Sequence, residues 1–295
     1  MIIYVSPTIF FGPLVYRLKK LWNANSYLVL RDFFPQWAID SNLISKYSPL
    51  TYFFKFFERI NYVAADFIGM MSHNNLEWFK SYYNADKSLE VLYNWSVINL
   101  ILDDSPNNYR KEFGLSNKVV FFYGGTFGHA QDMMNLIRLA KNMQNDERAH
   151  FVFVGDGDEL NLIKESILNY GLQNLTLLPS VNQKIYNKML NEFDVGLFTL
   201  NKNHKTHNFP GKTLGYMLNE KPILGSVNYG NDLKDIVEKF NAGFISFNGE
   251  DDLLVANARK LLSANLREQI GKNAKKLLID KFSVRVASKQ ILKKL

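Results

Sequence analysis

The second half of the chain alternates short apolar runs with longer helical patterns. Apolar strands that alternate with helices are typical of right-handed βαβ units on a parallel sheet. The pattern predicts a Rossmann-like α/β domain that two further helices, at about 249–263 and 265–280, complete. The expected strands lie at 119–123, 150–154, 175–178, 194–199, 222–226 and 243–247.

The first half is less regular and differs in composition. Residues 1–100 contain 23 of the 42 aromatic residues, including all four tryptophans. Three strands are expected there, at 2–5, 27–30 and 67–71, which is few for a nucleotide-binding sheet. We therefore predict an α/β protein with two Rossmann-like domains, the N-terminal one incomplete. The expected boundaries are 1–95 for the partial N-terminal domain, 96–114 for a polar linker, 115–280 for the C-terminal domain and 281–295 for a basic C-terminal helix or tail.

The composition is that of an ordinary globular protein. Of the 295 residues, 47% are hydrophobic and 21% are charged, a balance that supports one large or two ordinary cores. No apolar run approaches the roughly 18 residues of a membrane-spanning helix, and no secretory leader is recognisable. Cysteine is absent and the five histidines show no ligand spacing, so no metal is expected.

Two segments could meet a membrane. Residues 259–295 carry a net charge of +9, whereas the rest of the chain sums to −2. A basic helical segment suits an anionic membrane surface, and a solvated helix face is an equal alternative; nucleic acid is not expected as a partner. The aromatic segment 51–59 is interpreted first as buried core and second as a contact with the headgroup region of a bilayer.

A lysine stands at the start of an expected helix in the segment 207–217. Pro210 and Gly211 precede Lys212, and an apolar strand follows at 222–226. The N-terminus of a helix favours anions through its free N–H groups and its dipole. A lysine in the first turn strengthens that preference, so we expect Gly211 and Lys212 to bind the diphosphate of a nucleotide.

Glycine-rich turns follow the first two strands of the C-terminal domain. Glycine lets the backbone approach a ligand closely and direct N–H groups at phosphate. The spacing is not G-x-G-x-x-G, so dinucleotide binding is not indicated, and ordinary tight turns are the simpler alternative. Asp158 could cap the next helix in the second turn. The candidate contacts in these turns are Gly124, Gly125, Thr126, Gly128, Gly155 and Gly157.

Two later loops are expected at the same edge of the sheet. Ser180 follows the third strand, and Asn231 lies in a polar loop before another helix. Because the carboxyl ends of parallel strands meet at one edge, these loops should converge on a single crevice.

One acidic residue of the first half is a candidate for chemistry. Asp32 follows the second expected strand and precedes an aromatic-proline turn, so it could face the cleft between the domains. Beside Arg31 its carboxylate should stay ionised, and it could orient an acceptor hydroxyl or take its proton. Capping of the turn is the simpler interpretation.

Together these motifs resemble the donor-binding half of a GT-B glycosyltransferase of the retaining class called family 4. Within that class the chain is similar to bacterial enzymes of O-antigen and capsule assembly, particularly N-acetylfucosamine transferases. The resemblance implies a UDP-sugar donor, no cofactor or metal, a lipid-linked saccharide acceptor and a peripheral place on the inner, cytoplasmic face of the cytoplasmic membrane. It is carried by residues 6–12, 30–38, 123–128, 154–157, 208–212 and 220–223.

The chain departs from that family at several positions. The family's two glutamates, spaced E-x(7)-E near the transferred sugar and on the ribose, fall at His207 and Gly215. Gly125 stands where the family has an arginine, so Lys212 alone retains the diphosphate role. The resemblance thus makes His207 and Lys212 catalytic candidates and Gly215 a donor contact.

Two further departures concern the acceptor side. The family's acceptor-side histidine falls at Arg31, which leaves Asp32 as the third catalytic candidate. Enzymes of this architecture also carry a longer N-terminal domain, so the chain is expected to be N-terminally shortened. A nucleotide-sugar epimerase and a non-catalytic nucleotide-sugar-binding protein are the alternative functions.

Overall fold

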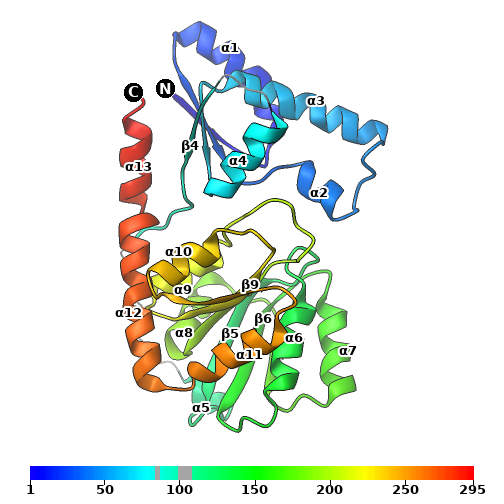
Figure 1. Ribbon diagram of the computed structural model, residues 1–295, viewed down its shortest axis with the longest axis vertical. Coiled ribbons are helices and arrows are strands. Elements are labelled where there is room, and N and C mark those ends of the chain that lie inside the picture. Colours follow the sequence, from blue (N-terminus) through cyan, green and yellow to red (C-terminus); the bar gives the residue numbers. More distant parts are fainter. Residues whose placement is uncertain (84–86, 99–107) are drawn as a thin grey trace.

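Two parallel sheets organise the molecule, one in each half of the chain (Figure 1). The computed structural model describes residues 1–83, 87–98 and 108–295. Helices cover the sheets, and the two halves lie one above the other along the longest axis (Figure 1). The α/β class with two parallel sheets that the sequence predicts is confirmed.

The N-terminal sheet has four parallel strands in the order β1-β2-β3-β4. Its central strand β2 is buried at every position, as expected for a parallel sheet covered on both faces. The elements are β1 (Ile2–Val5), η1 (Ile9–Phe11), α1 (Gly12–Trp22), β2 (Ser26–Leu30), α2 (Gln36–Asp40), α3 (Pro49–Ala64), β3 (Phe67–Met70), α4 (His73–Tyr82) and β4 (Ser88–Val91).

Strand β4 corrects the sequence-based prediction of three strands. Its sequence Ser-Leu-Glu-Val is short and half polar, with no residue fully buried, so it lacks the apolar run that marks a strand. It forms because β3 offers a free edge: Phe67 pairs with Ser88 and Met70 with Val91. Only the assembled sheet reveals this strand.

The C-terminal sheet has six parallel strands in the order β10-β9-β8-β5-β6-β7. Read from β7, this is the doubly wound order of strands. Strands β6 and β7 are added on one side of β5, and β8, β9 and β10 on the other. Ligands bind at the carboxyl ends of the strands where the order switches sides. The elements are α5 (Tyr109–Glu112), β5 (Val119–Thr126), α6 (Met133–Asn142), β6 (Ala149–Asp156), α7 (Leu160–Tyr170), β7 (Leu175–Leu178), α8 (Gln183–Glu192), β8 (Val195–Thr199), α9 (Lys212–Leu218), β9 (Ile223–Val227), α10 (Leu233–Lys239), β10 (Gly243–Phe247), α11 (Asp251–Lys260), α12 (Ala264–Lys281) and α13 (Val284–Leu292).

Alternate residues of β5 pack into two different hydrophobic cores, one on each face of the sheet. Val120 and Phe122 pack with α8, α9 and α12 on one face of the sheet. Phe121 and Tyr123 pack with α6 and α11 on the other. Burial on both faces explains why these strands read as continuous apolar runs in the sequence.

Helix α3 corrects the favoured interpretation of segment 51–59 as core. Glu58 and Tyr62 on one side of the helix are buried. Tyr52, Phe53 and Phe56 on the other side keep half or more of their surface exposed. The segment is therefore amphipathic with aromatic residues on its solvent side, a pattern that composition alone cannot separate from a buried helix.

The C-terminal helices return to the N-terminal sheet. Backbone hydrogen bonds join Ser96 to Phe282 and Val284, and α13 follows at this junction (Figure 1). Ala287 and Ile291, one turn apart on α13, are buried against Tyr27 and Val29 of β2 and against Leu92, which follows β4. The segment predicted as a basic helix or tail, residues 281–295, contains this packed helix. Of the predicted linker 96–114, residues 99–107 lie outside the described residues.

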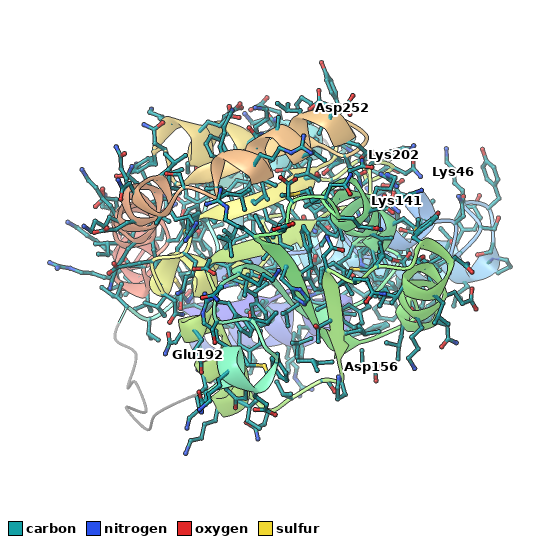
Figure 2. All side chains as sticks on the ribbon, turned by 90° about the horizontal axis from the view of Figure 1, so that it is seen from below. Lys46, Lys141, Asp156, Glu192, Lys202 and Asp252 are labelled. Atoms are coloured by element: carbon teal, nitrogen blue, oxygen red, sulfur yellow. The ribbon has the colours of Figure 1, made fainter. Side chains whose placement is uncertain are left out.

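Charged side chains project from the surface of the C-terminal half, among them Lys141, Glu192 and Asp252 (Figure 2). Within the described ranges, none of the helices combines the length and the apolar character needed to cross a membrane.

Candidate active site

A cavity of about 560 Å³ opens at the carboxyl ends of β5 and β6, beside the reversal of strand order. We call it the glycine-loop cavity. It brings together eight residues that the sequence predicts as donor contacts: Gly124, Gly125, Thr126, Gly155, Ser180, Gly211, Lys212 and Gly215.

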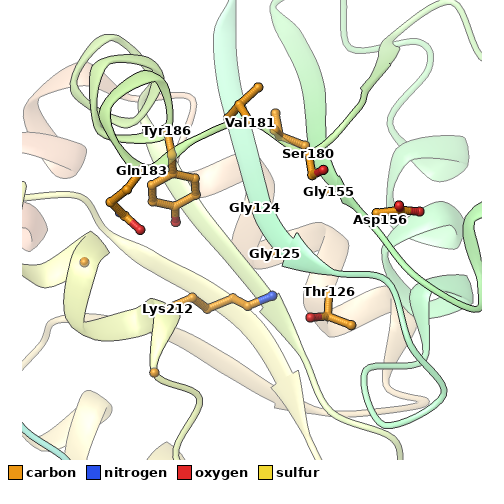
Figure 3. A pocket seen from close by; sticks show the side chains of 13 residues that line it. Gly124, Gly125, Thr126, Gly155, Asp156, Ser180, Val181, Gln183, Tyr186 and Lys212 are labelled. Carbon is orange, nitrogen blue, oxygen red and sulfur yellow. The ribbon is translucent and has the colours of Figure 1, made fainter.

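Lys212 is the first residue of α9, and its side chain reaches across the cavity toward Gly125 and Thr126 (Figure 3). Its Nζ atom is buried and has no hydrogen-bond partner within the described residues. It lies 3.4 Å from the centre of the Tyr123 ring, a cation–π contact. Burial lowers the pKa of Lys212 to about 7. An amine in this position is poised to gain a proton when an anion arrives.

The helix terminus itself contributes less than the sequence suggests. Helix α9 has only seven residues. The N–H groups of Thr213 and Leu214 already donate to the carbonyl groups of Pro210 and Gly211. The positive charge offered to a ligand therefore rests mainly on the Lys212 side chain.

The glycines at the carboxyl ends of β5 and β6, which the sequence places in turns after the strands, allow close approach. At Gly124, a Cβ atom would lie 2.2 Å from the Tyr186 ring, so only glycine lets this ring rest on the strand. Gly125 has φ of +129°, which favours glycine. A Cβ atom at Gly125 would lie 3.4 Å from the Lys212 Nζ atom. The space in the glycine-loop cavity beside the Lys212 amine thus depends on Gly124 and Gly125.

Two cavity residues on α8 were missed by the sequence-based reasoning. Gln183 and Tyr186 project from the first turn of α8 into the cavity (Figure 3). Burial raises the pKa of Tyr186 to about 12, so its hydroxyl stays protonated as a donor. The available signal was Asn182, whose side chain caps α8 directly after the Ser180 loop.

A second cavity, of about 440 Å³, lies between the two halves of the molecule. We call it the interdomain cavity. Gly211 and Lys212 line both cavities, so the two spaces meet at Lys212. On the N-terminal side the lining includes Arg31, Asp32 and Trp37.

Asp32 lies in the interdomain cavity, as the sequence predicts. Its carboxylate accepts a hydrogen bond of 2.9 Å from the Asn208 side chain. Burial raises the pKa of Asp32, and Arg31 and Asn208 oppose this only in part. The expectation that Asp32 stays ionised beside Arg31 stays a prediction. The Arg31 guanidinium also stacks on Trp95 at 4.3 Å and bonds to Asn94.

His207 lines neither cavity. Its backbone N–H and carbonyl pair with the side-chain amide of Asn75, at 2.7 and 3.1 Å. Its ring lies 3.4 Å from the amide of Asn228, and burial lowers its pKa. Because Asn75 belongs to α4, this pairing ties the loop before Lys212 to the N-terminal half.

Three other predicted donor contacts also lie outside both linings. The Asn231 side chain is buried and bonds to Asn208, Asn228 and Leu233, which braces its own loop. That loop meets α4, since Asp232 accepts the N–H of His73 at 2.8 Å. Gly157 packs on the Phe127 backbone and Gly128 on the Gln131 side chain.

The described part of the chain contains no group of three His, Asp or Glu residues arranged to hold a metal ion. The expectation that neither metal nor cofactor is needed stays a prediction.

A family model connects these features with known proteins. The model for glycosyl transferases group 1 matches residues 105–277, more than half of the chain and the whole of the C-terminal sheet. The chain is 26% identical over 242 residues to a probable glycosyltransferase, WbjE of Pseudomonas aeruginosa, covering 79% of this chain and 58% of WbjE. It is 26% identical over 184 residues to WcaI of Escherichia coli, a putative colanic acid biosynthesis glycosyl transferase, covering 60% of this chain and 45% of WcaI. The chain thus spans about half the length of these curated relatives.

Solved structures agree on the fold. HepE of Anabaena, crystallised with UDP, superimposes with a TM-score of 0.76 at 17% identity, over 99% of this chain and 78% of HepE. WaaG, a glycosyltransferase involved in lipopolysaccharide biosynthesis, superimposes with a TM-score of 0.71 at 13% identity, over 95% of this chain and 80% of WaaG. The two-sheet architecture is that of the GT-B fold. With the family match over the sheet that carries the glycine-loop cavity, the chain belongs to the group 1 glycosyl transferases.

Proposed function

We propose that this chain transfers a sugar from a UDP-sugar to a saccharide acceptor, with retention at the anomeric carbon, as in family 4. The observation that carries the proposal is the Lys212 amine, which is buried, has no hydrogen-bond partner within the described residues and faces a glycine-lined floor. A buried cation without a partner is costly, and a diphosphate would supply the missing anion.

Lys212 would stabilise the charge that develops on the leaving diphosphate. A preorganised cation in a site shielded from water stabilises such charge more than in bulk solvent. As the bond between the anomeric carbon and the diphosphate oxygen breaks, negative charge grows near Nζ. The relatives support UDP as the nucleotide, because HepE was crystallised with UDP and with UDP-glucose.

Ribose recognition would come from residues other than the family's glutamate. Gly215 offers no side chain at that position, and the cavity contains Gln183 and Tyr186 nearby. An amide and a protonated phenol can both hydrogen-bond a diol. We therefore assign the ribose and sugar contacts to α8.

Asp32 would act on the acceptor. It lies in the interdomain cavity, which meets the glycine-loop cavity at Lys212. A carboxylate whose pKa is raised by burial is a better proton acceptor than a solvated one. We assign to Asp32 the orientation of the acceptor hydroxyl and the uptake of its proton during attack on the anomeric carbon.

The resemblance and the relatives suggest the biological setting. WcaI and WaaG carry names from polysaccharide and lipopolysaccharide biosynthesis. We propose a lipid-linked oligosaccharide as acceptor, in O-antigen or capsule assembly at the cytoplasmic face of the membrane. N-acetylfucosamine is the sugar that the sequence resemblance favours.

Calorimetric titration of the purified chain with UDP, GDP and ADP tests the donor site. Selective UDP binding should be lost in Lys212→Ala and kept in Lys202→Ala, which removes an exposed lysine. Absence of any nucleotide binding in the unmutated chain would refute the proposal.

Product analysis separates the alternatives. Incubation of a UDP-sugar without acceptor yields a new UDP-sugar only if the chain is an epimerase. UDP binding without transfer to any lipid-linked acceptor would identify a non-catalytic binding protein.

A further inference from the structure

The outer surface of α1 and α3 exposes an unusual number of apolar side chains. Tyr52 and Phe56 on α3 are 63% and 61% exposed, and Trp22 on α1 is 61% exposed. A large exposed apolar patch on a folded protein marks an interaction surface. We call this patch the α1–α3 face; with Phe10 and Phe11 of the adjoining η1, it comprises Leu14, Tyr16, Leu21, Trp22, Leu50, Tyr52, Phe53, Phe56 and Val63.

The face also carries positive charge that no acid balances. Arg17, Lys20 and Arg59 are exposed, and none of them forms an ion pair with a described residue. The only acid within α1 and α3 is Glu58, which is buried. Lys20 lies 4.5 Å above the Tyr16 ring, so cation and aromatic surface are interleaved. Aromatic side chains beside unpaired cations complement the anionic headgroup layer of a bilayer.

Aromatic contacts continue from this face to the interdomain cavity. Ring centres are separated by 5.7 Å between Phe53 and Phe54, 4.9 Å between Phe54 and Phe34, and 6.1 Å between Phe34 and Trp37. Trp37 lines the interdomain cavity together with Asp32. An acceptor held at the surface by its lipid would therefore have a continuous aromatic path to the proposed reacting groups.

The basic C-terminal segment fits a membrane less well. Five of its eleven cations pair with acids: Arg259, Arg267, Lys272, Lys275 and Lys294. Helices α12 and α13 run along the length of the molecule (Figure 1), so the remaining charges are spread out. The apolar side of α13 is already buried on the N-terminal sheet.

We infer that the α1–α3 face docks on an anionic lipid bilayer and delivers the acceptor to the interdomain cavity. This inference rests on the proposed function, since it assumes an acceptor anchored in the same bilayer. Docking through this face would leave the glycine-loop cavity of the opposite half open to a soluble nucleotide sugar.

Vesicle co-sedimentation of the full chain tests the inference. The vesicles contain either phosphatidylcholine alone or phosphatidylcholine with phosphatidylglycerol. The charge variant is Arg17→Gln/Lys20→Gln/Arg59→Gln. Its matched control is Arg285→Gln/Lys289→Gln/Lys293→Gln, on α13 and at its C-cap. The apolar variant is Tyr52→Ser/Phe56→Ser on α3, and its matched control is Leu168→Ser/Tyr170→Ser on α7. Calorimetric UDP affinity, measured on every variant, shows whether the fold and the donor site survive.

Unmutated chain should bind the anionic vesicles more tightly than the neutral ones. Loss of three cations near an anionic surface should weaken that binding by about 10²-fold. The apolar variant should lose about tenfold on both vesicle types, and the two controls should lose little. UDP affinity should stay unchanged throughout, so a failed donor site remains distinguishable from failed docking.

Three results would overturn the inference. The α13 control could weaken binding as much as the α1–α3 charge variant, which would assign docking to the basic segment. The unmutated chain could bind UDP but no vesicle. Sedimentation velocity could show a dimer that the apolar variant dissociates, which would make the face a contact between two copies.

Discussion

Replacing Lys212 with methionine should stabilise the protein and abolish its nucleotide affinity at the same time. The amine is wholly buried and has no hydrogen-bond partner within the described residues. Methionine has a similar length, carries no charge and can contact the Tyr123 ring through its sulfur. A buried lysine that lowers the stability of the fold is expected to be retained only where function requires its charge.

The size of the effect follows from the pKa of Lys212. Burial lowers that pKa from 10.5 to about 7, and each pKa unit corresponds to about 1.4 kcal/mol, which together amounts to about 4 to 5 kcal/mol. The cation–π contact with Tyr123 offsets about 1 to 2 kcal/mol of this cost. We therefore expect Lys212→Met to raise the free energy of unfolding by about 3 kcal/mol at neutral pH.

The sign of the pH dependence is determined by the same shift. Between pH 7 and 10.5 the unfolded chain holds a proton on Lys212 that the folded protein lacks. The stability of the unmutated protein should therefore rise with pH across this window. The advantage of Lys212→Met should be largest below pH 7 and shrink toward pH 10.5.

Urea denaturation followed by circular dichroism, at about pH 6 and about pH 10, measures the difference. Lys276→Met, at an exposed lysine of α12, is the matched control and should leave stability unchanged. Titration with UDP completes the test, because a bound diphosphate should raise the pKa of Lys212. UDP affinity of the unmutated chain should then be flat below pH 7 and fall about tenfold per pH unit above it. A variant less stable than the unmutated protein at about pH 6, or one that keeps its UDP affinity, would refute the reasoning.

Two further substitutions test the interdomain side. Asp32→Asn keeps the shape and removes the proton acceptor, so UDP release in the presence of lipid-linked acceptor should slow by about 10²-fold or more while UDP affinity stays unchanged; an unaltered rate would leave Asp32 with a capping role only. Asn75→Ala removes both hydrogen bonds to the His207 backbone, and urea denaturation should show a loss of about 2 to 3 kcal/mol. Unchanged stability in Asn75→Ala would mean that water replaces the pairing without cost.

Much of the C-terminal half could be read from the sequence. Strands β5, β6, β8 and β9 are apolar runs buried on both faces, so periodicity and turn residues locate them without knowledge of their neighbours. The loops after β5, β6, β7 and β9 were predicted to converge because parallel strands end at one edge. The first three contribute five of the predicted residues to one cavity, whereas Asn231, after β9, lies outside its lining. The sequence was therefore sufficient for features that depend on one segment alone, such as the position of a strand and the loop that follows it.

The tertiary structure decided what depends on two segments at once. Strand β4 exists because β3 offers it an edge. Helix α13 is packed because β2 and Leu92 present an apolar surface to it. The ring of Tyr186 enters the site because Gly124 leaves room for it, and His207 turns away because Asn75 holds its backbone. Composition could show that the segment 51–59 is rich in aromatic residues, but not which side of the helix faces water. The sequence by itself thus determined the order of the elements and the residues at their ends. Contacts between distant segments decided which of those residues meet, because burial and hydrogen bonding depend on neighbours in space.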